Sequence, residues 1–357
     1  MASIAKFFFI LLSLCMLNSV TTASNVTAIF AFGDSTVDSG NNNHFNTLFR
    51  SDHLPYGRDF PTHLPTGRFS NGKIATDFLA QILGIKDLLP AYLNPLVTDN
   101  DLITGVSFAC GGAGLDPNTV ALAKVFGLST QYGLFEQAMR RISSVYGEEK
   151  ATNIVENALF VISIGTNDML YNVYLSPVRI TRYGSISSYQ DFMLQNLDAF
   201  IQRLYAAGAR RILVAGLPPI GCLPIEITLT SMLPSQHWLQ RLCNIQQNLD
   251  SKGYNNKLQS HIHLLQSTLT AAKIAYFDIY KPILDMVRNP AKYGFEETVD
   301  GCCGTGLLEM GPVCNIMELT CPDSSKYLFW DAVHLTEAGN YFLAQSGRKN
   351  VLPYLTN

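Results

Sequence analysis

Short apolar runs alternate with amphipathic stretches along most of the chain. Four runs have the continuous apolar character of strands that a parallel sheet buries on both faces, and a shorter run at 106–109 predicts a fifth strand. The clearest helical pattern covers 192–205, where apolar residues recur at helical spacing and Gly208 supplies a stop. This alternation predicts a mainly parallel sheet covered by helices on both sides. The four strand runs are 29–32, 159–164, 212–215 and 274–277.

The amino-terminal pattern is different, because Lys6 precedes a largely apolar run at 7–17 that small residues follow up to Ala23. This arrangement is typical of a secretory leader, and the run is too short to span a bilayer. A buried first helix is the alternative, but the run has no amphipathic period. The pattern therefore predicts a signal peptide over 1–23 and an extracellular mature chain. No later stretch of about twenty apolar residues suggests a transmembrane segment.

The remaining residues, 24–357, contain no repeat, low-complexity tract or linker and predict a single domain. The formal net charge of −3 provides no basic field for nucleic acid or anionic lipid. Charged residues make up 15% of the chain, against an average of about a quarter, so much of it is expected to be buried or to face something apolar. The sequon Asn25-Val26-Thr27 predicts a glycan on Asn25.

The cysteines predict a disulfide framework. Of the eight, Cys15 lies in the predicted leader, and the odd remainder implies at least one free thiol, for which Cys110 is the expected residue. Four cysteines close together predict two bridges in either pairing, and a further pair flanks another insertion. A zinc knuckle is the alternative, but the two adjacent cysteines lack the usual ligand spacing. The cluster is Cys302, Cys303, Cys314 and Cys321, and the further pair is Cys222 and Cys243.

Polar residues follow three of the predicted strands and also appear in one late loop. Ligands in open α/β sheets bind beyond the carboxyl ends of the strands, so these residues are expected to meet at one rim. Ser35 is a weak nucleophile until an imidazole takes its proton, and His334 needs a carboxylate such as Asp331 to hold its tautomer. The Ser35 N–H, the Gly111 N–H and the Asn167 amide are the expected donors to an oxyanion. These are the groups that acyl transfer requires.

Four motifs in this order resemble the blocks of the GDSL lipolytic enzymes, also called SGNH hydrolases, in their plant form. They are Phe32-Gly33-Asp34-Ser35-Thr36-Val37-Asp38-Ser39-Gly40-Asn41-Asn42, Phe108-Ala109-Cys110-Gly111-Gly112-Ala113-Gly114, Gly165-Thr166-Asn167-Asp168 and Asp331-Ala332-Val333-His334. The resemblance implies a flavodoxin-like three-layer α/β/α sandwich and an apoplast or cell-wall location. It also implies Ser35, Asp331 and His334 as the triad, with Gly111 and Asn167 as oxyanion donors.

The sequence departs from the common plant pattern in positions that remove no catalytic group. Thr36 replaces the leucine of the motif, Ser107 and Cys110 stand where asparagine and serine are usual, and Leu335 replaces a proline. An α/β-hydrolase is disfavoured because Val37 interrupts the Gly-x-Ser-x-Gly pattern.

The expected function is a secreted hydrolase of lipid or other acyl esters that needs no cofactor or metal. Two alternatives stay open: an acyltransferase that uses the same site, and an inactive binding protein of the same fold. Pocket walls are expected from the loops at 43–65, 169–187 and 217–243. The sequence indicates neither the acyl-chain length nor the oligomeric state.

Overall fold

The computed structural model describes residues 26–231 and 240–356. The predicted signal peptide and Asn25 lie outside these residues. The central sheet contains four parallel strands in the order β1-β2-β3-β4, which confirms the four main predicted runs to within one residue at each end. These strands are β1 (Ile29–Gly33), β2 (Leu159–Ser163), β3 (Arg211–Ala215) and β4 (Lys273–Phe277).

The fifth strand predicted at 106–109 is wrong as an element. The segment runs beside β1, where Phe108 N–H donates to Ala31 O at 2.8 Å, but only Ser107 forms isolated bridges. On the other side of the segment, the Asn41 amide donates to the carbonyls of Ser107 and Ala109. On that side the backbone also pairs at Ser107, which donates to Pro90 O at 2.8 Å and accepts the Tyr92 N–H at 2.9 Å, but the pairing stops at an isolated bridge.

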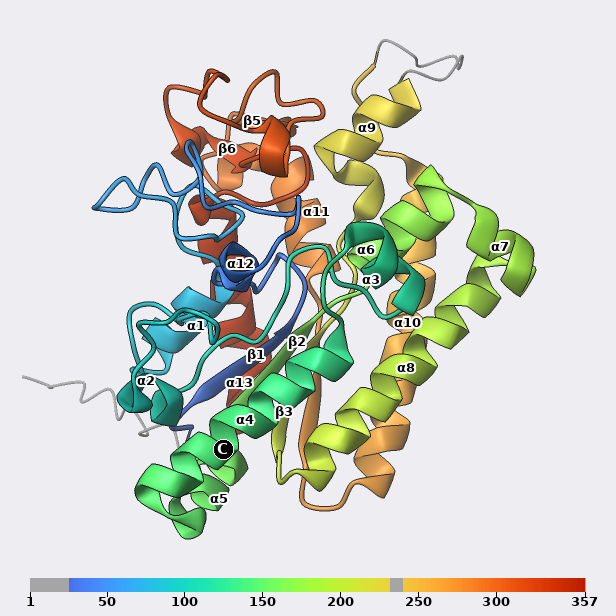
Figure 1. Cartoon of the computed structure of the whole chain (residues 1–357). Helices are drawn as coiled ribbons and strands as arrows, with labels where there is room; N and C mark the ends of the chain where they lie inside the picture. Colours follow the sequence, from blue (N-terminus) through green and yellow to red (C-terminus); the bar gives the residue numbers. More distant parts are fainter. Residues whose placement is uncertain (1–25, 232–239, 357) are drawn as a thin grey trace, which may run out of the picture.

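Helices cover both faces of the sheet, which confirms the expected three-layer α/β/α fold (Figure 1). One face is covered by α4 (Leu128–Tyr146), α8 (Ile186–Ala206) and α10 (Ile245–Thr268). The other is covered by α1 (Ala75–Ile82), α11 (Tyr280–Arg288), α12 (Glu337–Asn350) and α13 (Leu352–Thr356). The remaining helices are α2 (Asp99–Thr104), α3 (Pro117–Ala123), α5 (Glu148–Asn157), α6 (Thr166–Met169), α7 (Val178–Tyr183) and α9 (Pro224–Ser231).

Helix α8 contains the predicted 192–205 segment but begins six residues earlier, at Ile186. Its start is fixed by Ser185, whose hydroxyl accepts the Ser188 N–H at 3.0 Å and so satisfies one free donor of the first turn. In the part of the chain that the structure describes, no helix is long and apolar enough to cross a membrane.

The two faces of the sheet carry side chains of different size, because successive residues of a strand point to opposite faces. Toward α4 and α8, the strands present Phe30, Phe32 and Phe160, whose rings pack together and against Phe135 and Phe200. Toward α1 and α12, the same strands present mostly smaller side chains. This second set includes Ala31, Gly33, Val161, Ser163, Leu213 and Ala215.

A second, two-stranded sheet was missed by the sequence patterns. It pairs β5 (Glu297–Gly301) with β6 (Tyr327–Phe329), near the end of the chain. The loop between these strands contains the disulfides Cys302–Cys321 and Cys303–Cys314, one of the two predicted pairings. Cys222 pairs with Cys243 as expected, and Cys110 is a buried free thiol. The four loop cysteines form a separate apolar cluster with Tyr56, Phe69 and Trp330.

A buried ion pair ties the early loops to α1. The Arg68 guanidinium donates to both carboxylate oxygens of Asp77 at 2.7 and 2.8 Å, and the exposed fractions of the two side chains are 4% and 0%. Asp77 also accepts the backbone N–H groups of Ile74 and Leu89. The pair therefore fixes the start of α1, whose residues Ala75 and Thr76 line the same cavity as Ser35, just after β1.

We expect Arg68→Leu to lower the free energy of unfolding by about 3–5 kcal/mol, because it leaves the buried Asp77 carboxylate without its partner. The measurement is urea unfolding of the purified protein. Arg141→Leu is the matched control, since the Arg141–Asp99 pair is largely exposed and should cost about 1 kcal/mol or less. Equal losses in the two variants would contradict this account of the pair.

Candidate active site

Ser35 lies on a sharp turn at the carboxyl end of β1. Gly33 enters the turn with a φ of 137°, and a Cβ there would lie 1.8 Å from Ser163 O, so only glycine fits. The Gln131 side chain bonds both the N–H and the carbonyl of Gly33 at 2.8 Å. The Asp34 carboxylate accepts the N–H and the hydroxyl of Thr36. The serine is therefore held by hydrogen bonds on both sides of it.

His334 connects Ser35 to Asp331. His334 Nε2 lies 2.7 Å from Ser35 Oγ, and Nδ1 lies 2.8 Å from Asp331 Oδ2 and 2.9 Å from Oδ1. Asp331 Oδ1 also accepts the backbone N–H groups of Val333 and His334, which closes the loop into a tight turn. Asp331 is fully buried, and the imidazole side chain is 10% exposed. The structure thus brings together all three residues expected for the triad.

Tyr56 is part of the site, and the sequence patterns did not find it. Its hydroxyl donates to Asp331 Oδ2 at 2.7 Å and accepts the Gly311 N–H at 2.7 Å. Burial and the neighbouring Asp331 carboxylate raise the pKa of Tyr56 well above its ordinary value, so the hydroxyl keeps its proton. No local motif marks this tyrosine, which lies 275 positions before its partner.

The disulfide-bonded loop forms hydrogen bonds to the backbone just before the Asp331–His334 turn. Cys302 N–H donates to Phe329 O at 3.0 Å, and Cys303 N–H donates to Trp330 O at 2.8 Å. The Phe69 ring packs 4.9 Å from the His334 ring, centroid to centroid, and limits its rotation. The cystines therefore sit where they restrain the backbone that carries Asp331 and His334.

The expected oxyanion donors differ in whether their hydrogens already have acceptors within the protein. Asn167 Nδ2 donates one hydrogen to Ala113 O at 2.9 Å, which leaves its second hydrogen. The Gly111 N–H, however, is shared between Asp38 Oδ2 and Asn42 Oδ1 at 3.1 and 3.0 Å. Among residues 26–231 and 240–356, no acceptor is bonded to the N–H of Ser35 or of Gly112. The sequence suggested the Gly111 N–H as an oxyanion donor. In this turn, however, the N–H without an acceptor among the described residues is that of Gly112.

Comparison with known proteins identifies the family of the chain. The sequence pattern of the GDSL-like lipase/acylhydrolase family matches residues 29–346. The chain belongs to this family. The assignment confirms the enzyme class expected from the motifs, a carboxylic ester hydrolase.

Three relatives match this chain over most of its length. One protein of Arabidopsis thaliana, named a GDSL esterase/lipase, is 49% identical over 346 residues, which cover 97% of this chain and 95% of the relative. A second, of the same name and organism, is 44% identical over 94% of each chain. A third is 47% identical over 87% of this chain and 85% of its own.

The buried carboxylates of Asp34, Asp38 and Asp168 accept hydrogen bonds that hold the loops around Ser35. Burial raises the pKa of Asp34 and of Asp38 to about 6 and that of Asp168 to about 7. Asp168 accepts the backbone N–H groups of Leu115 and Asp116 at 2.8 and 2.9 Å. Asp168 therefore links the turn that carries Asn167 to the segment at 115–116, which follows the Gly111-Gly112 turn.

An apolar cavity of about 90 Å³ adjoins Ser35 and His334. The expected walls are largely wrong, because the described residues of 43–65 and 169–187 contribute no lining to it. From 217–243, only Pro218 and Leu223 take part among the described residues. The strands and helices themselves form most of the wall, since the small side chains on this face of the sheet leave the space open.

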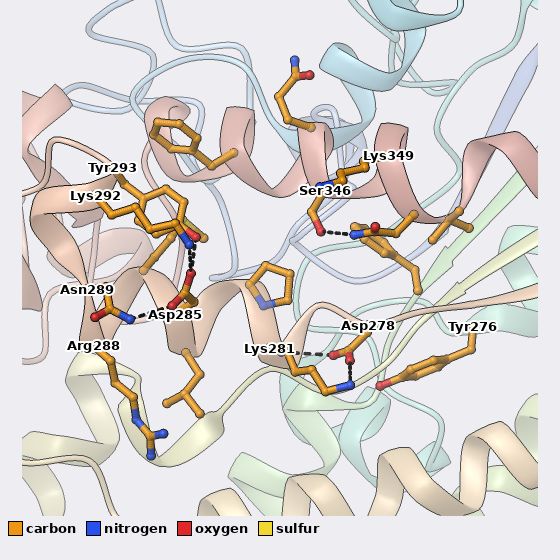
Figure 2. Close-up of a pocket in the computed structure, with 18 of the residues that line it drawn as sticks. Tyr276, Asp278, Lys281, Asp285, Arg288, Asn289, Lys292, Tyr293, Ser346 and Lys349 are labelled. Atoms are coloured by element: carbon orange, nitrogen blue, oxygen red, sulfur yellow. Dashed lines mark hydrogen bonds and ion pairs between the residues drawn. The ribbon is translucent and has the colours of Figure 1, made fainter.

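A larger groove of about 1090 Å³ lies at the surface beside α11 and α12 (Figure 2). Its charged side chains are mostly paired with one another, as Figure 2 shows for Lys281 with Asp278 and Lys292 with Asp285. Ser35, Asp331 and His334 are not among the residues that line it. Within residues 26–231 and 240–356, no three His, Cys, Asp or Glu side chains gather into a metal site.

We expect Tyr56→Phe to lower kcat about ten- to a hundredfold with little change in KM. The substitution removes a hydrogen bond to the Asp331 carboxylate, worth about 1.5–3 kcal/mol, and Tyr56 is fully buried and does not line the cavity beside Ser35. Steady-state kinetics on an activated ester measure both constants. Tyr254→Phe is the matched control, because its buried hydroxyl has no partner among the described residues. An unchanged kcat would mean that the other donors hold Asp331 unaided.

Proposed function

We propose that the chain is a serine esterase with Ser35 as nucleophile, His334 as general base and acid, and Asp331 as the orienting carboxylate. One observation carries the proposal. Hydrogen bonds run without interruption from Ser35 Oγ through both imidazole nitrogens to the fully buried carboxylate of Asp331. In this arrangement the imidazole can accept the serine proton, while the carboxylate stabilises the imidazolium that forms.

The reaction proceeds through an acyl-enzyme. Ser35 Oγ attacks the ester carbonyl carbon and passes its proton to His334 Nε2. The tetrahedral intermediate then expels the alcohol, which takes that proton. Water next attacks the acyl-serine, giving its proton to His334, and the carboxylic acid leaves as Ser35 regains the proton. No step requires a cofactor.

The developing oxyanion is stabilised by the Ser35 N–H, the Asn167 amide and the Gly111-Gly112 turn. Two observations support this set. One hydrogen of Asn167 is fixed to Ala113 O, which orients the amide in advance. On the glycine turn, an oxyanion would compete with Asp38 and Asn42 for the Gly111 hydrogen, and the Gly112 N–H has no such competitor among the described residues.

The substrate class is a lipid or other acyl ester. An acyltransferase would differ only in the acceptor, because an alcohol would attack the acyl-serine in place of water. Analysis of the products with added alcohol distinguishes the two. An inactive binding protein is the weaker alternative, since such a protein has no need of a hydrogen-bonded triad.

We further propose that the enzyme acts outside the cell. The three disulfides support this, since such bonds form and persist in oxidising compartments. The predicted leader agrees with export. Secretion of the full-length chain, compared with a chain that lacks 1–23, tests the proposal.

We expect Ser35→Ala to lower kcat about a millionfold, the loss typical of a removed serine nucleophile. The kcat of the Asp331→Asn variant should fall about ten-thousandfold, because the amide favours the wrong imidazole tautomer. Ser39→Ala is the control, since Ser39 is also a buried serine close to the turn and its hydroxyl has no partner among the described residues. Full activity in Ser35→Ala, measured on a chromogenic ester, would end the proposal.

For Asn167→Ala we expect kcat to fall about a hundred- to a thousandfold while KM changes little. An oxyanion donor acts mainly on the transition state, so the loss belongs to kcat. Asn196→Ala is the comparison, because that amide also donates to a backbone carbonyl, Leu115 O at 3.0 Å, but has no place at the oxyanion. Equal kcat in the two variants would leave Asn167 as a structural residue of the turn.

A further inference from the structure

We propose that the apolar cavity beside Ser35 holds the acyl group of the substrate and selects short acyl chains, of about four carbon atoms. The inference rests on the proposed esterase function and goes beyond it by naming the part of the ester that is buried. It concerns the interior space between the sheet and the helices that cover its face of small side chains. The evidence is the position, depth, size and polarity of this space.

The cavity begins at Ser35 and His334 and extends inward between the sheet and the helices that cover this face. At its mouth lie Ser35 and His334, and its sheet wall contains Ser163 and Ala215 at the carboxyl ends of their strands. Val161 and Leu213 also line it, and they lie two residues earlier on the same face. Two residues of a strand span about 6.6 Å, so the space continues inward by about that distance.

The opposite wall comes from helices. Leu79 of α1, Ile283 of α11 and Leu343 of α12 line the cavity, and each is 7% exposed or less. The inner sheet residues Val161 and Leu213 are 3% and 1% exposed. The inner end of the cavity is therefore surrounded by core residues and offers no route for a bound group to leave on that side.

A dead end of this kind suits the acyl group better than the alcohol. The acyl group stays bonded to Ser35 between the two steps, so it needs a place that leaves the mouth free for water. The alcohol must depart after the first step, and an enclosed cavity would slow its release. The geometry therefore points to acyl occupancy, with the alcohol directed toward the solvent.

The volume sets the chain length. An engineered protein cavity of about 150 Å³ holds benzene, which has six carbon atoms. By the same ratio, the cavity of about 90 Å³ holds roughly four. Longer chains would have to displace core side chains, and close-packed cores resist such displacement. Acetyl groups would fit but leave part of the apolar space empty.

One polar atom in the wall offers a separate probe of what fills the cavity. Thr76 lines it and is fully buried, and its hydroxyl has no hydrogen-bond partner among the described residues. Valine has nearly the shape of threonine without the hydroxyl. If an alkyl chain lies here, Thr76→Val should leave the preferred chain length unchanged and lower KM for butyrate esters.

The first experiment compares two ester series on the wild-type enzyme. In one, the acyl group grows from two to twelve carbons on a fixed alcohol, and in the other the alcohol grows on a fixed butyryl group. We expect kcat/KM to rise about fourfold per methylene up to roughly four acyl carbons and then to fall at least tenfold by eight. The alcohol series should show no such limit. A limit in the alcohol series alone would overturn the proposal and leave the esterase function standing.

Cavity variants provide the second experiment. Ala215→Leu should fill the space and move the optimum to acetyl esters, whereas Leu343→Ala should enlarge it and move the optimum to six or more carbons, by roughly the side-chain volume removed. Leu197→Ala is the matched control, since this buried leucine lies on α8, at the other face of the sheet. Ile283→Val, a milder enlargement, serves where Leu343→Ala does not fold. An optimum that none of the lining variants moves would contradict the proposal.

A third measurement does not depend on turnover. Butyrate should raise the Tm of the Ser35→Ala protein, octanoate should raise it less, and Leu343→Ala combined with Ser35→Ala should reverse that order. Loss of ester cleavage by the wild type, with this binding pattern retained, would reject the esterase function but keep the cavity assignment. Equal shifts for both acids in both proteins would reject the cavity assignment itself.

Discussion

The burial of the Asp331 carboxylate is the constraint on which the site depends. A charge taken out of water is costly unless hydrogen bonds replace its hydration, and here four donors do so. They are the Tyr56 hydroxyl, the N–H groups of Val333 and His334, and His334 Nδ1. Tyr56 is itself fixed by Gly311 in the disulfide-bonded loop. The second sheet, the cystines and the early loop thus serve one requirement, the correct solvation of a single buried anion.

The unequal faces of the central sheet determine where a substrate has room. On the side of α4 and α8, interlocked phenylalanine rings fill the layer, and a further group would have to break aromatic contacts. On the side of α1 and α12, Ser163 and Ala215 at the strand ends, with Val161 and Leu213 further in, line a cavity that reaches Ser35. The Arg68–Asp77 pair keeps α1 in place above this cavity. Alternation of residue size along the strands therefore shapes both the core and the site.

Local sequence patterns predicted much of the fold and pointed to the candidate site. They could not predict contacts between residues that lie far apart in the sequence. Continuous apolar runs identified the four central strands, and polar residues after strand ends and in one late loop pointed to Ser35, Asn167 and the Asp331–His334 turn, which the structure places at one end of the sheet. Tyr56 escaped because its role depends on a contact across 275 positions. The sequence pointed to the Gly111 N–H as an oxyanion donor, but Asp38 and Asn42 accept that hydrogen, and the Gly112 N–H has no acceptor among the described residues. Pocket walls were assigned to loops because side-chain size on one sheet face is not visible as periodicity.

The distance along the chain between the nucleophile and its base has a consequence for biosynthesis. Ser35 and His334 are 299 positions apart, so the serine emerges early from the ribosome and the imidazole near the end. Without the imidazole, Ser35 is an ordinary alcohol with no means of losing its proton. In the proposed mechanism, activity therefore requires nearly the whole chain, from Ser35 through His334. By the same mechanism, a nascent chain or fragment that ends before His334 lacks the base and contributes nothing to an ester-cleaving signal.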